Sequence, residues 1–125
     1  MLIGKELIKP DPAKKPEYCV GEKEPKKFLF NCCECNNALS INFQTQINSG
    51  WDGKTKNITY EEVQILKNHY ALGENSNAHG NGFPTFDLLT CKKCKTKYYT
   101  YTGVDEWKYG AYAVYIQGVI KKNAV

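Results

Sequence analysis

The sequence predicts a mainly β-fold of the α+β class, an antiparallel sheet with one helix inserted between two of its parts. Three observations support this prediction. Several stretches alternate apolar and polar residues, as half-buried strands do. Tyrosine is abundant, with 9 residues, and methionine is nearly absent, which is typical of β-rich chains. Two Cys-x-x-Cys pairs each lie between two strand-like stretches.

Residues 1–27 are predicted to form an irregular arm rich in lysine, glutamate and proline. Its prolines are Pro10, Pro12, Pro16 and Pro25. Proline blocks a long helix and disfavours a central strand. Apolar residues near the start, from Leu2 to Ile8, could attach the arm to the body. Cys19 lies inside the arm and is interpreted as a reduced thiol, with a ligand or redox role as the alternative.

Residues 28–120 are predicted to form the folded body, beginning with two strands around the first cysteine turn. Residues 28–30 are apolar and enter the turn, and residues 38–47 leave it with clear alternation, which predicts a half-buried strand. Asn36 follows the last cysteine of this turn. Asparagine tolerates the left-handed conformation that the exit of such a turn needs.

Residues 48–84 are predicted to be a loop–helix–loop insert. Asp52-Gly53 is a turn signal in the first loop. Thr59 and Glu62 then form a capping-box pattern, which predicts the start of a helix of about three turns. Tyr60, Val63, Leu66 and Tyr70 follow at helical spacing, and Gly73 suits the stop. The glycine- and asparagine-rich residues 73–84 predict the second loop.

The rest of the body is predicted to be strands around the second cysteine turn. Residues 85–90 enter this turn and residues 95–103 leave it, with a further turn expected at 103–106. Residues 111–120 are long and rich in β-branched side chains, which favours a central position in the sheet. Residues 121–125 are expected to be a frayed tail.

The two cysteine pairs predict one structural metal site. Its candidate ligands are Cys32, Cys35, Cys91 and Cys94. Four thiolates can surround one Zn²⁺ tetrahedrally and leave no open position for a substrate water, so the site is expected to be structural and not catalytic. Iron uses the same ligands and remains an alternative.

Cys33 makes the first pair ambiguous, because it could replace Cys32 as a ligand. The two-residue spacer of Cys32 and Cys35 is the usual one, and Cys33 is therefore the alternate ligand or an exposed thiol open to redox chemistry. The isolated histidines His69 and His79 are interpreted as ordinary surface residues.

This arrangement resembles the zinc-ribbon class, in which cysteine turns on strand pairs meet at one ion. The resemblance covers residues 28–47 and 85–120, and it implies the four ligands above, with backbone N–H groups donating to their sulfurs. Two features differ from that class. The segment between Cys35 and Cys91 is much longer than a minimal ribbon uses, and Cys33 stands where the class often has proline.

Length and composition indicate how many domains the chain forms and in which compartment it is expected. At 125 residues the chain forms one domain with a modest core, so a metal site would supply much of its stability. No apolar run is long enough to cross a membrane, and the first residues lack a secretory signal. A reducing cytoplasm is expected, where cysteine pairs more often bind metal than form disulfides. In a secreted protein, the six cysteines could instead form three disulfides.

The sequence contains no pattern that predicts an enzyme. A Ser-His-Asp arrangement, a phosphate-binding glycine motif and a helical H-E-x-x-H are all missing. Neither cysteine pair precedes a helical pattern, as thioredoxin-like chemistry requires. A redox or electron-transfer protein is the remaining alternative to a binding protein.

A protein-interaction module, of adaptor or inhibitor type, is the function the sequence favours. Loops on a rigid, metal-stapled base would present aromatic side chains, and these are common interface anchors. The candidate anchors are Trp51, Tyr70 and Phe83.

A nucleic-acid-binding protein is the alternative function. The second cysteine turn and the strand after it place cations beside aromatic rings, which suits phosphates and bases. The candidate contacts are Lys92, Lys93, Lys95, Lys97, Tyr99 and Tyr101. The net charge of +4 permits such a partner without requiring one. The simpler interpretation is that the tyrosines are ordinary sheet residues and the lysines offset thiolate charge.

Overall fold

The protein is mainly antiparallel β-structure with two helices in the described part of the chain. The computed structural model describes residues 3–19, 27–49, 52–73, 77–79, 82–108 and 111–123. The predicted α+β, mainly-β class agrees with this structure. The prediction of a single helix is wrong, because a short second helix precedes the expected one.

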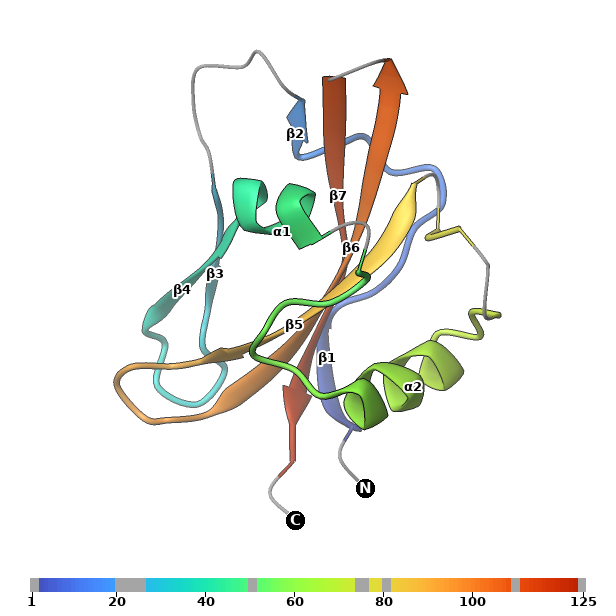
Figure 1. The fold of residues 1–125 in the computed structure, drawn as a ribbon. Helices are drawn as coiled ribbons and strands as arrows, with labels where there is room; N and C mark the ends of the chain where they lie inside the picture. The colour runs from blue at the N-terminus through green and yellow to red at the C-terminus, as the bar shows by residue number, and fades with distance from the viewer. Residues whose placement is uncertain are drawn as a thin grey trace.

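A five-stranded antiparallel sheet forms the centre of the molecule (Figure 1). Its order is β1 (Ile3–Ile8), β7 (Ala111–Lys122), β6 (Lys97–Lys108) and β5 (Phe83–Thr90), and β2 (Tyr18–Cys19) pairs with β7 as well. The predicted central strand is therefore β7, which has β6 on one side and β1 and β2 on the other. The turn predicted at 103–106 is wrong, because β6 runs through it to Lys108.

A separate two-stranded hairpin carries the first cysteine turn. It consists of β3 (Lys27–Asn31) and β4 (Ala38–Asn42), and α1 (Phe43–Ser49) follows β4 directly. The strand predicted over 38–47 therefore ends at Asn42. The side-chain oxygen of Asn42 accepts a hydrogen bond from the Thr45 backbone N–H at 3.0 Å, which starts a helix there instead.

The second helix, α2 (Tyr60–His69), is the one that the sequence predicts. Its capping box is complete: Thr59 accepts from the Glu62 N–H at 3.2 Å, and the Glu62 carboxylate accepts from the Thr59 N–H at 3.2 Å. The same carboxylate accepts from the Tyr99 hydroxyl and, at 2.9 Å, from the Lys122 ammonium. One side chain thus both caps α2 and attaches it to the sheet.

The central sheet has a hydrophobic cluster on each face, and the hairpin and α2 cover opposite faces. On one face, Leu39, Ile41 and Phe43 pack with Tyr98 and with residues of β7. On the other, Val63 and Leu66 of α2 pack with a second set of sheet residues. That second set includes Phe86, Tyr99, Tyr101 and Ile120. Alternation along β6 therefore sends Tyr98 towards the hairpin and its tyrosine neighbours towards α2.

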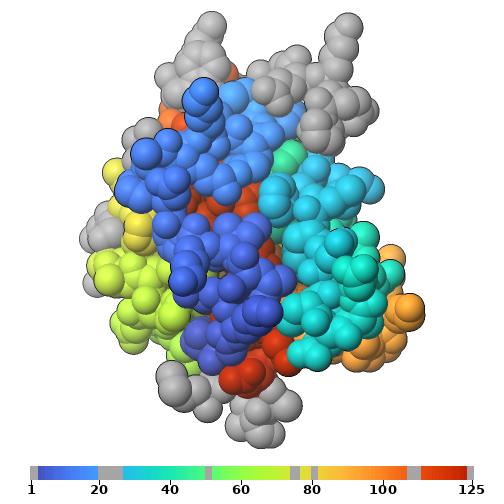
Figure 2. All heavy atoms as spheres, turned by 180° about the vertical axis from the view of Figure 1, so that it is seen from behind, coloured from blue at the N-terminus to red at the C-terminus, as the bar shows by residue number. Residues whose placement is uncertain are grey.

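The N-terminal segment is more ordered than predicted. Residues 3–8 and 18–19 pair with β7, whereas residues 9–17 between them are irregular, as expected. Figure 2 shows this segment lying over β7, between the hairpin and α2. Pro10, Pro12 and Pro16 fall outside the paired stretches, which explains how a proline-rich arm still adds an edge strand.

Candidate metal centre

The two cysteine turns have the same backbone geometry. In the first, the Cys32 N–H donates to the Asn37 carbonyl at 2.8 Å, and the Asn36 N–H donates to the Cys32 carbonyl at 2.9 Å. In the second, Cys91 and Lys95 make the equivalent bonds at 2.8 and 2.9 Å. Asn36 has φ 63° and Lys95 has φ 68°, so each turn leaves through a left-handed residue. The prediction for Asn36 is confirmed.

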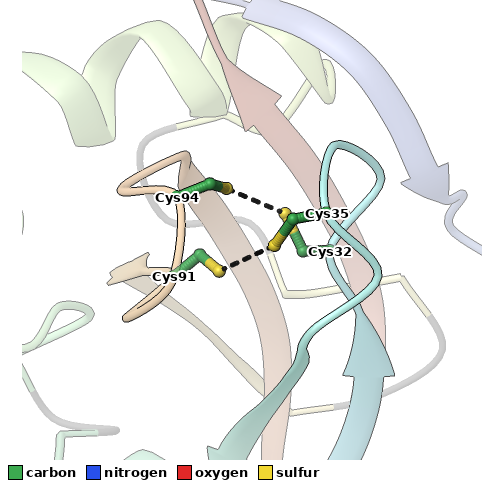
Figure 3. A group of neighbouring side chains, drawn as sticks. All are labelled: Cys32, Cys35, Cys91 and Cys94. Carbon is green, nitrogen blue, oxygen red and sulfur yellow. Dashed lines mark hydrogen bonds between the residues drawn. The ribbon is translucent and has the colours of Figure 1, made fainter.

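The four cysteine sulfurs from these turns lie close together (Figure 3). Each lies within 4.8 Å of the other three, and the Cys32–Cys94 and Cys35–Cys91 sulfur pairs are both 3.5 Å apart. Zn–S bonds of about 2.3 Å place tetrahedral sulfurs about 3.8 Å from one another. The cluster therefore has the size of a four-thiolate metal site, and none of these cysteines forms a disulfide.

The remaining ligand candidates lie outside this cluster. Cys33 is exposed and does not belong to the four-sulfur group. His69 contacts the Glu6 carboxylate at 3.1 Å, and the His79 ring lies 2.8 Å from the Tyr101 hydroxyl. Among the described residues, the four cysteines are the one cluster of His, Cys, Asp and Glu side chains suited to a metal ion.

Tyr98 contacts the candidate metal centre, and the sequence analysis did not identify it as part of the site. Its ring is fully buried, and its hydroxyl lies 3.0 Å from the Cys32 sulfur and 3.3 Å from the Cys33 sulfur. The hydroxyl also accepts a hydrogen bond from the Cys33 N–H at 2.9 Å. The signal that could have identified it is alternation, because Tyr98 points to the opposite face from Tyr99 and to the same face as the hairpin.

Two further polar side chains contact the cluster. The Asn37 amide nitrogen lies 3.8 Å from the Cys91 sulfur, and the Thr96 hydroxyl lies 3.0 Å from the Cys94 sulfur. Both residues close their own cysteine turn through the backbone carbonyl that accepts from Cys32 or Cys91. Donors of this kind orient thiolates and offset their charge.

The surroundings shift the pKa values of three of the four cysteines. Burial opposes ionisation of Cys32, but hydrogen bonds from Tyr98 and from the backbone N–H groups of Glu34 and Cys35 lower its pKa to about 6. The Cys94 N–H lowers the pKa of Cys91 against the effect of burial. For Cys35, the N–H of Asn37 favours the thiolate, but burial and the neighbouring sulfurs raise its pKa to about 12. The thiolate is the form that binds metal, and these hydrogen bonds favour it at Cys32 and Cys91.

The predicted nucleic-acid contacts divide into two groups. The four lysines of the second turn and its exit strand, Lys92 to Lys97, are all exposed. Tyr99 and Tyr101 are 1% and 0% exposed and belong to the core beneath α2. Their rings therefore cannot stack on bases in this fold.

The predicted protein-interface anchors differ in their exposure. Phe83 is 50% exposed at the start of β5. Tyr70 is only 6% exposed, because it packs against Tyr101 with ring centroids 4.5 Å apart, so it stabilises the core. Trp51 lies outside the described residues.

Comparison with protein-family models, with curated proteins and with solved structures finds no match to this chain. The metal centre therefore rests on its own geometry. In the described part of the chain, neither helix is long and apolar enough to span a membrane.

Proposed function

We propose that the protein is a small binding module whose fold is stapled by one structural Zn²⁺ held by Cys32, Cys35, Cys91 and Cys94. The observation that carries the proposal is the convergence of four sulfurs from two equivalent turns. The paired turns also support the zinc-ribbon resemblance. With four thiolates the coordination shell is closed, which fits a structural ion and not an enzyme.

The ion would connect two separate parts of the fold. Two ligands come from the β3–β4 hairpin and two from the turn between β5 and β6, and these strand pairs belong to different sheets. Bound Zn²⁺ would make two Zn–S bonds to each strand pair and so link them, and such coupling contributes directly to folding. A reducing cytoplasm, which keeps the thiols reduced, suits this role. Iron in the same site is the alternative, and a coloured protein would indicate it.

A protein partner is the first candidate ligand of the module. Phe83 supports it as a large, half-exposed aromatic side chain next to the rigid sheet. The test is a pull-down with the zinc-loaded protein and with Phe83→Ala, using Leu29→Ala as a control because Leu29 is also exposed, on the hairpin. A partner lost only with Phe83→Ala supports the proposal, whereas equal recovery by all three proteins contradicts it.

A nucleic acid is the second candidate, because the lysines of the second turn are exposed. Binding through these cations predicts retention on heparin at low salt and elution as salt increases. Failure to bind heparin at low salt would reject this candidate.

A further inference from the structure

A lysine-lined pocket lies beside the metal centre. Its volume is about 580 Å³, and it is bounded by the second cysteine turn and by the end of β7. Four lysines line it: Lys95, Lys97, Lys121 and Lys122. Two of them come from the segment expected to be a frayed tail, so this pocket exists only because β7 continues to Lys122.

The four ammonium groups have different partners. Lys121 pairs with Glu34, and Lys122 pairs with Glu62 at 2.9 Å. Lys95 donates to the Lys92 carbonyl at 3.2 Å, and Lys97 donates to the Thr90 hydroxyl at 3.0 Å. In the described ranges, neither Lys95 nor Lys97 has a carboxylate partner. Each ammonium carries three N–H donors, so these two lysines keep donors and charge for a ligand.

The lysines around the pocket carry more positive charge than the zinc–thiolate centre and the nearby acids can neutralise. A zinc ion with four thiolates carries a formal charge of −2, and the nearby acids Glu34 and Glu62 add two negative charges. The four pocket lysines together with exposed Lys92 and Lys93 outnumber these charges. The region therefore remains cationic when the metal site is filled, and it suits a ligand with several negative charges.

We propose that this pocket binds phosphate groups of a nucleic-acid backbone, with Lys95 and Lys97 as the main contacts. The proposal rests on the second candidate above and specifies its site. Lys92 and Lys93 lie on the same turn outside the pocket, where further phosphates of an extended chain can follow. The neighbouring tyrosines are buried, so binding should depend on phosphate charge and not on base identity.

A lipid surface fits this site less well. Peripheral binding to a membrane combines basic side chains with apolar ones that enter the bilayer. The exposed large apolar side chains among the described residues are Leu29, Tyr60, Ile65 and Phe83. None of them lines the pocket.

The test measures fluorescence anisotropy of a labelled oligo-dT strand with zinc-loaded protein over a range of salt concentrations. The wild type should bind at low salt, with log K falling linearly against log salt. In Lys95→Ala/Lys97→Ala, log K should fall less steeply with log salt, with a slope smaller in magnitude by about 1.4. Each phosphate contact to a single strand contributes about 0.7 to the magnitude of this slope. Lys15→Ala/Lys56→Ala removes the same charge from exposed positions outside the pocket, so it should retain the wild-type slope.

Further measurements distinguish a nucleic acid from free phosphate and from lipid headgroups. They also separate a failure of the pocket proposal from a failure of the structural zinc site. Mixed-sequence strands should bind as oligo-dT does. Absence of binding at low salt, an equal loss in both double variants, a strong base preference, or displacement by low concentrations of inorganic phosphate would each overturn the proposal. Binding to phosphatidylserine vesicles in place of the oligonucleotide would overturn it as well. The zinc content of every sample is measured, so a zinc-loaded protein that does not bind refutes the pocket and leaves the metal staple intact.

Discussion

Individual hydrogen bonds to the cysteine sulfurs influence how tightly the candidate centre can bind a metal ion. Tyr98 is buried, and it reaches Cys32 from the opposite sheet, so the centre is supported by a side chain from the core as well as by its own turns. The four cysteines were predictable from their spacing. Tyr98 was missed, because alternation places it opposite Tyr99 but does not show that the first cysteine turn lies over that face of the sheet.

Tyr98→Phe should lower zinc affinity about 10-fold or more, because removing a hydrogen bond to a ligand typically has that effect. The ring remains, so the protein should stay folded. The measurement is competition with a chromogenic chelator. Tyr60→Phe, at a position 67% exposed, is the matched control and should bind zinc normally. Equal affinity in the two variants would show that the Tyr98 hydroxyl does not support the centre.

Glu62 should give the stability of the protein a distinct pH dependence. Burial opposes its charge, but hydrogen bonds from Tyr99 and Lys122 lower its pKa to about 2 from the ordinary 4.5. A depressed pKa means that the stabilisation is complete above pH 4.5 and is lost as the pH falls towards 2. Glu62→Gln should therefore cost about 2 kcal/mol at neutral pH, and this cost should shrink below pH 4.5.

The measurement for Glu62 is chemical denaturation of the wild type and the variant at several pH values. Acid also releases zinc from thiolates, but this affects both proteins, so the difference between them isolates the carboxylate. A difference that is constant from neutral pH to pH 3 would contradict the assigned hydrogen bonds.

At the scale of elements, local signals predicted α2 but not α1. Thr59 and Glu62 give α2 a capping box, whereas α1 follows a strand without a loop, and its apolar residues continue the strand's alternation as far as Phe43. Buried Gln46, whose side-chain oxygen accepts from the Thr102 hydroxyl at 3.1 Å, would lie on the polar face of a continued strand, so alternation did not indicate its burial. The N-terminal strand was missed for a different reason, because its partner β7 is more than a hundred residues away in the sequence.

Gly118 on β7 allows α2 to lie against the sheet. A Cβ at this position would overlap the Tyr70 hydroxyl and lie 2.8 Å from the Cζ atom of that ring. Gly118→Ala should therefore destabilise the protein by about 1–3 kcal/mol, as overpacking of a core does.

A double-mutant cycle with Tyr70→Leu tests the assigned contact by chemical denaturation. The two changes should be less destabilising together than their separate costs predict, because the shorter side chain makes room for the new methyl group. Additive costs would show that Gly118 and Tyr70 act independently.

At the scale of the whole molecule, a metal ion bound by the four cysteines would join the hairpin to the central sheet. The two hydrophobic clusters lie on opposite faces, and the candidate ligands Cys32 and Cys91 belong to the cluster beneath the hairpin. Loss of the ion should therefore release the hairpin first and leave α2 packed on its own face. Hydrogen exchange of the chelator-treated protein should be faster in β3 and β4 than in β6 and α2. Uniform protection across all four elements would contradict this coupling.

The most direct test of the account is metal analysis of protein purified without added metal, for the wild type, Cys35→Ser and Cys33→Ser. The wild type and Cys33→Ser should each contain about one zinc per chain, because the Cys33 sulfur lies outside the cluster, and Cys35→Ser should lose most of it. A wild-type protein that is folded, contains no zinc or iron and has these four cysteines as reactive thiols or disulfides would contradict the central claim.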